Sequence, residues 1–190
     1  MATKNAVFMR LLAFRKRLIA RTIKGEEPEN CNNRKDECIE SSDERSSVKC
    51  EEKKKRYILN NTRKKHIVSY KMDGGIICVD ATVPAQTPKC DYLYVVEGER
   101  PAAILVELKG VDVRKAMGQI DSTLMLFPKF FRSCSNVYGR IVVSSSIPRL
   151  KAEPSYLKLQ RKLMTSYGGN LKIQERQLEE KDTELDKVKP

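Results

Sequence analysis

The chain has 190 residues, of which 40% are hydrophobic and 33% are charged, and its formal net charge is +12. This length suits one folded domain with polar arms and excludes two full domains. No apolar run approaches the roughly 20 residues that a membrane-spanning helix needs. The six cysteines form no CxxC pair, which favours buried thiols in a reducing compartment, and we therefore expect a cytoplasmic protein.

Residues 1–24 are predicted to form a basic amphipathic helix, with seven basic and no acidic residues. Its apolar residues recur near helical spacing: Phe8, Leu11, Leu12, Leu18 and Ile19. Three uses of this helix remain open. It could contact a polyanion, act as a mitochondrial transit peptide although it lacks the usual serines, or dock on a membrane or partner.

A polar connector is predicted over residues 25–47, which contain eight acidic and three basic residues. Because it has few apolar side chains, we expect few contacts with the rest of the chain. The spacing of Cys31, Cys38 and Cys50 is irregular and does not favour a zinc site. A second basic block follows at residues 49–71, with nine basic and two acidic residues. Such blocks attract nucleic-acid phosphates, although a solvated surface is the simpler explanation of either one alone.

Residues 48–177 are predicted to form one α/β domain. Short apolar runs separated by Asn, Gly and Pro predict strands within residues 56–60, 66–72, 74–80, 91–97 and 102–109. Asp73, with the two glycines that follow it, is expected to form a tight turn rather than a ligand.

The second half of this domain alternates between helix and strand. Helical spacing predicts a helix over 113–127 with Asp112 as its N-cap. A strand within 139–146, a helix from Pro154 to Tyr167 and a strand within 170–176 follow. This order predicts a central mixed β-sheet flanked by helices, and residues 178–190 are expected to be a charged tail that frays.

Three charged residues, Asp91, Glu107 and Lys109, interrupt the apolar strands. Glu107 and Lys109 are two apart on one strand, so their side chains share a face. If the two strands pair antiparallel through the turn near residues 98–101, Asp91 lies opposite Glu107, with Cβ atoms about 5 Å apart. Two such carboxylates repel, and a hard divalent cation such as Mg²⁺ converts the repulsion into a binding site. The simpler alternative is an exposed ion pair at a strand edge.

Asp91, followed after a strand and a turn by Glu107, Leu108 and Lys109, resembles the PD-(D/E)XK nuclease superfamily over residues 73–176. The resemblance implies a restriction-endonuclease-like core in which Asp91, Glu107 and the carbonyl oxygen of Leu108 bind Mg²⁺, with Mn²⁺ as a substitute. It also implies that Lys109 assists the attacking water.

Gln119 lies on the following predicted helix, where several members of the superfamily carry a glutamine. We expect it to contact substrate or Lys109 and to tune activity. The sequence departs from the family pattern at Cys90, where the family name has Pro, and at Thr123, which replaces the Tyr of the stronger Gln-x-x-x-Tyr pattern. Many members carry a further upstream acid, and four candidates remain open: Glu40, Glu44, Glu51 and Glu52.

These observations predict a Mg²⁺-dependent nuclease, with DNA favoured over RNA as the substrate, acting as a homodimer or in a larger assembly. The alternative is a non-catalytic nucleic-acid-binding module, or a subunit of a defence or repair complex, on the same fold. Other chemistries are less well supported. The only histidine, His66, excludes mechanisms that need His pairs, and Ser144 to Ser146 lack a G-x-S-x-G elbow.

Overall fold

The computed structural model describes residues 39–73, 86–145 and 150–187, with only the backbone of residue 39. The basic helix predicted over residues 1–24, most of the predicted connector and the strand predicted over 74–80 lie outside the described residues. No helix in the described ranges is both long enough and apolar enough to cross a membrane.

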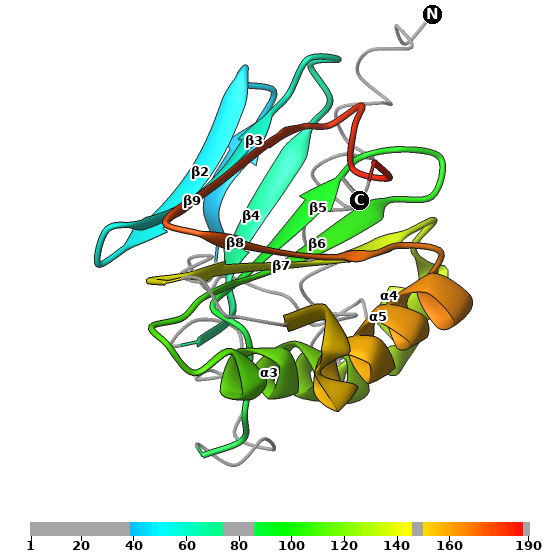
Figure 1. Cartoon of the computed structure of the whole chain (residues 1–190). Helices are drawn as coiled ribbons and strands as arrows, with labels where there is room; N and C mark the ends of the chain where they lie inside the picture. The colour runs from blue at the N-terminus through cyan, green and yellow to red at the C-terminus, as the bar shows by residue number, and fades with distance from the viewer. Residues whose placement is uncertain (1–38, 74–85, 146–149, 188–190) are drawn as a thin grey trace, which may run out of the picture.

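The fold is α/β and is built on a six-stranded mixed sheet in the order β1-β4-β5-β6-β7-β8 (Figure 1). The neighbours from β1 to β6 pair antiparallel, whereas β6, β7 and β8 run parallel. Its strands are β1 (Ile39–Asp43), β4 (Ile67–Lys71), β5 (Tyr92–Val96), β6 (Ala102–Leu108), β7 (Val137–Val143) and β8 (Leu171–Glu175). The predicted mixed sheet is therefore confirmed.

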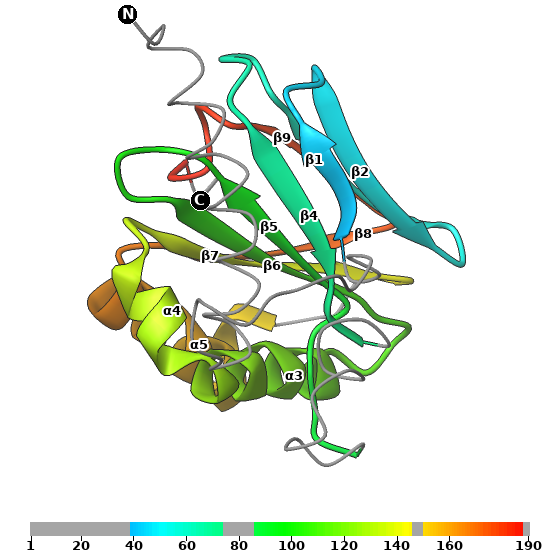
Figure 2. The ribbon, with the colours of Figure 1, turned by 180° about the vertical axis from the view of Figure 1, so that it is seen from behind.

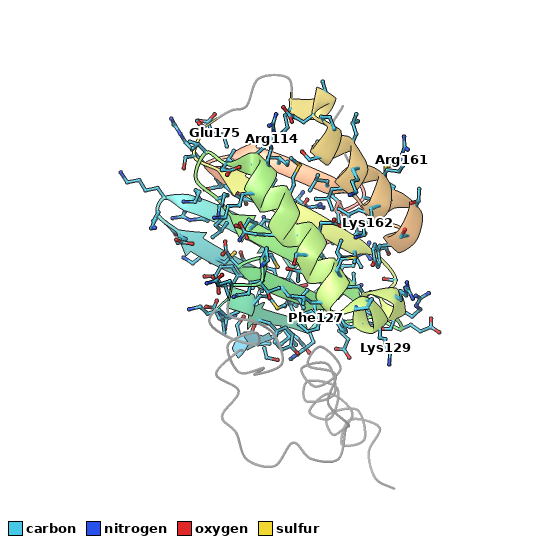
Figure 3. All side chains as sticks on the ribbon, turned by 90° about the horizontal axis from the view of Figure 1, so that it is seen from below. Arg114, Phe127, Lys129, Arg161, Lys162 and Glu175 are labelled. Atoms are coloured by element: carbon cyan, nitrogen blue, oxygen red, sulfur yellow. The ribbon has the colours of Figure 1, made fainter. Side chains whose placement is uncertain are left out.

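Helices cover one face of this sheet, and Figure 3 shows this layer from below, with Arg114 at one end and Lys129 at the other. The layer consists of α3 (Val113–Leu126), α4 (Pro128–Ser133), the short 3₁₀ turn η3 (Leu150–Ala152) and α5 (Pro154–Tyr167). The predicted cap of α3 is confirmed, because the Asp112 side chain accepts a hydrogen bond from the backbone N–H of Lys115 at 2.9 Å. Buried apolar residues of α3 and α5 pack on the sheet.

A second, three-stranded sheet covers the opposite face, in the order β2-β3-β9 (Figures 1 and 2). Its strands are β2 (Ser47–Glu52), β3 (Lys55–Asn60) and β9 (Gln177–Lys181). A separate apolar core lies between the two sheets.

This second sheet corrects two predictions. The single central sheet is wrong, and residues 178–190 do not begin as a fraying tail, because β9 pairs in parallel with β3. The predicted connector is also wrong in part. Its last residues form β1, which pairs antiparallel with β4.

Candidate active site

Asp91 and Glu107 face each other at one end of the large sheet. The antiparallel pairing of Tyr92 with Val106 places Asp91 opposite Glu107, one step further along the two strands, as the sequence predicts. Odd-numbered residues of β6, such as Leu105, lie in the core beneath the helices. Because side chains alternate along a strand, Glu107 points to the helix side of the sheet.

The Glu107 carboxylate is nearly inaccessible, with 1% exposure. Its Oε2 atom is buried and has no hydrogen-bond partner among the described residues, while its Oε1 atom lies 3.7 Å from Nζ of Lys109. The opposing Asp91 Oδ2 accepts a hydrogen bond of 2.7 Å from the backbone N–H of Leu108. A buried polar atom without a partner is unfavourable, so Oε2 requires either a proton or a bound cation.

The pKa values of the two carboxyl groups reflect this arrangement. Burial, together with the charge of Asp91, raises the pKa of Glu107 to about 8, against the opposing effect of Lys109. Burial raises the pKa of Asp91 to about 6, although the hydrogen bond from Leu108 lowers it. Without a cation, the pair therefore holds at least one proton at neutral pH.

The stability of the metal-free protein is expected to depend on this pair. Both folded-state pKa values are raised, so the folded protein binds more protons than the unfolded chain from about pH 4 to about pH 8. The free energy of unfolding should therefore fall as pH rises through that window, by at most about 1.4 kcal/mol per pH unit for each group.

Urea denaturation in EDTA across pH 5 to 8 measures this slope. Glu107→Gln should flatten it. Carboxyl groups whose pKa is lowered in the fold, such as Asp43, affect stability only at lower pH. An identical slope in wild type and variant would contradict the assignment.

Gln119 lies on α3 and fixes the segment that leads to Asp91. Its Nε2 atom donates a hydrogen bond of 2.8 Å to the carbonyl oxygen of Lys89, and the expected contact with the lysine of the motif is not made. Thr123, one turn further on, accepts a hydrogen bond of 2.9 Å from the backbone N–H of Cys90. The residue that replaces the family's Tyr thus anchors the same segment as Gln119.

Asp73 belongs to the site, although the sequence pattern was interpreted as a tight turn. It forms an ion pair with Lys89, Oδ1 to Nζ 3.3 Å, and its charge raises the pKa of both Asp91 and Glu107. A signal existed in the sequence. Asp73 directly follows the strand that pairs with β5, so it ends close to the start of β5, next to Asp91.

The four upstream acids differ in their surroundings. Glu51 is engaged in an ion pair of 2.7 Å with Arg56, whereas the charge of Glu52 raises the pKa of Asp91. Within the described ranges, no three His, Cys, Asp or Glu side chains lie close enough together to hold a metal ion. Among described side chains, the ligands available to a cation are therefore the facing Asp91 and Glu107.

The other candidate residues have structural surroundings. His66 lies 2.9 Å from the Ser42 hydroxyl, Nε2 to Oγ, and so links β4 to β1. Cys50 is buried in the core between the two sheets, which does not suit a zinc ligand.

Fold and site together define an α/β protein with a buried carboxylate pair at the end of a mixed sheet. No known protein family, curated protein or solved structure matches the chain.

Proposed function

We propose that the chain is a metal-dependent nuclease with a restriction-endonuclease-like core that hydrolyses phosphodiester bonds, of DNA in preference to RNA. The supporting observation is the buried Oε2 of Glu107, which has no partner among the described residues and faces Asp91, with Lys109 alongside. An exposed ion pair at a strand edge does not fit, because Glu107 is buried and faces a second carboxyl group.

The residues fit a hard divalent cation such as Mg²⁺, or Mn²⁺ in its place, because such ions prefer oxygen ligands. Asp91, Glu107 and the carbonyl oxygen of Leu108 would hold it. When bound, the ion supplies a more acidic water and stabilises charge on the phosphate. Glu107 must give up its proton for this to happen, since the pKa of the free group is about 8.

The chain's own groups then position and neutralise. The Lys109 ammonium, 3.7 Å from Oε1 of Glu107, is close enough to act on the attacking water or on charge that develops at the phosphate. Gln119 acts through the backbone of Lys89 and is a positioning residue for Asp91.

Lys109→Ala is expected to lower the cleavage rate by about 10²- to 10³-fold, the range for removing one group that stabilises a transition state. Metal affinity should change little when it is measured at pH 9, where Glu107 is ionised without help from Lys109. Lys115→Ala, an exposed position on α3, is the matched control. Equal losses of metal affinity and rate would make Lys109 part of the metal site instead.

Incubation with plasmid, linear duplex, single-stranded DNA and RNA in Mg²⁺, Mn²⁺ or Ca²⁺ tests the function itself. Cleavage that needs Mg²⁺ or Mn²⁺ supports the nuclease. The alternative, a non-catalytic binding module or a subunit of a defence or repair complex, is favoured by the absence of a three-ligand cluster among the described side chains. Binding without cleavage in every metal would support that alternative.

A further inference from the structure

The turn between β2 and β3 has an unusual sequence for its backbone conformation. Glu52 pairs with Lys55, so only Lys53 and Lys54 form the loop. Both have positive φ, 47° and 66°, as a type I′ turn requires. Such turns strongly favour Asn and Gly, because a side chain at positive φ is strained. Two lysines in these positions are unfavourable for folding and suggest a use for their charge.

This turn lies at the same end of the molecule as the carboxylate pair. The backbone N–H of Arg56 donates to the carbonyl of Arg176 at 2.9 Å, and that of Arg176 donates to Val143 at 2.8 Å. Val143 ends β7, whose neighbour β6 carries Glu107 near its own end. Figures 1 and 2 agree, with the turn beside the tip of β7 and on the side where α3 begins.

The charge at the turn is available to a ligand. Lys53 is 83% exposed and only 3.7 Å, Nζ to Oε1, from the partly exposed Glu52. Lys54 is exposed and forms no ion pair with a described residue. Lys49, on β2, is also exposed. Flexible ammonium groups of this kind suit phosphate oxygens, which they contact as point charges.

We propose that the β2–β3 turn contacts the phosphate backbone of duplex DNA, with Lys53 and Lys54 holding phosphates beside the scissile bond. This inference rests on the proposed function, because it takes the substrate of the carboxylate site as the ligand of the turn. A duplex whose phosphate lies at Glu107 continues past the end of the sheet, where the turn lies.

The test is a double variant, Lys53→Asn with Lys54→Gly, which removes both charges and installs the preferred residues for this turn. Its melting temperature should rise, so loss of binding cannot be assigned to misfolding. The slope of log affinity for a labelled DNA duplex against log salt concentration should fall by about 2, or about 0.9 for each phosphate contact. Binding is measured in Ca²⁺ so that Mg²⁺-dependent cleavage does not interfere.

The matched control is Lys129→Gln with Arg132→Gln, which removes two exposed charges from α4. Lys129 lies at the opposite end of the helical layer in Figure 3, so this variant should keep the wild-type slope. Lys53→Gln with Lys54→Gln keeps the strained turn and should lose the same slope as the first variant.

An unchanged slope in the turn variants, or an equal loss in the control, would overturn the inference even if the protein cleaves DNA. A lost slope in a protein that binds but never cleaves would leave the inference standing and end the nuclease proposal alone. A wild-type protein that does not bind duplex DNA at low salt would overturn both.

Discussion

Glu107→Gln is expected to abolish Mg²⁺-dependent cleavage while leaving the metal-free protein at least as stable as the wild type at pH 8. Glutamine keeps the size of the side chain but cannot carry the negative charge that a divalent cation requires. A loss of about 10³-fold or more is expected, which corresponds to about 4 kcal/mol of transition-state stabilisation. The stability should hold because the substitution removes a buried carboxylate that repels Asp91.

Glu99→Gln is the matched control, since Glu99 is exposed in the turn between β5 and β6. Cleavage assays and urea denaturation, run side by side on the three proteins, separate a catalytic from a structural role. Wild-type cleavage by Glu107→Gln would sink the nuclease proposal. A marked drop in metal-free stability would make Glu107 a structural group.

Glu180→Ala is expected to lower the free energy of unfolding by about 3 to 5 kcal/mol, the range for breaking one side of a buried ion pair. Glu180 is paired with Arg140, which is fully buried on β7. The same carboxylate accepts hydrogen bonds from the Tyr57 hydroxyl at 2.9 Å and from Nζ of Lys172 at 2.6 Å. Removal of Glu180 would leave the Arg140 charge buried without its counter-charge.

Glu179→Ala provides the control, because Glu179 precedes Glu180 on β9 but points to the exposed face. Its loss should change stability by about 1 kcal/mol or less. Urea denaturation of both variants measures the difference. Equal effects of the two substitutions would mean that β9 is held by its backbone pairing and not by the buried network.

The sequence was sufficient where one residue pattern determined one element. The helix α5 has the predicted bounds, and α3 begins at its predicted cap. The strands β5 and β6 are continuous apolar runs because both faces of the central sheet are covered. The facing of Asp91 and Glu107 followed from the odd number of residues in the loop that joins these strands.

The second sheet could not be predicted because its signal is spread over distant, charged segments. Strand β2 buries only Val48 and Cys50, and β9 buries Leu178 together with a charged residue, Glu180. Such short patterns resemble polar loops. Only the parallel pairing of β9 with β3, far apart in the chain, makes them strands.

The surroundings of the site also depend on tertiary contacts. Gln119 was identified from its helix, but its partner, the carbonyl of Lys89, is set by how α3 packs on the sheet. Asp73 was placed in a turn, and its effect on Asp91 becomes visible only when β4 and β5 are paired.

The most direct test of the central claim is calorimetric titration of Mg²⁺ into the wild-type protein and Glu107→Gln, in buffers of different ionisation enthalpy. Because the pKa of Glu107 is about 8, binding at pH 7 should release close to one proton, and the release should nearly vanish at pH 10. Glu107→Gln should bind weakly or not at all. Tight binding by Glu107→Gln, or wild-type binding without proton release at pH 7, would contradict the assignment of Glu107 as a metal ligand.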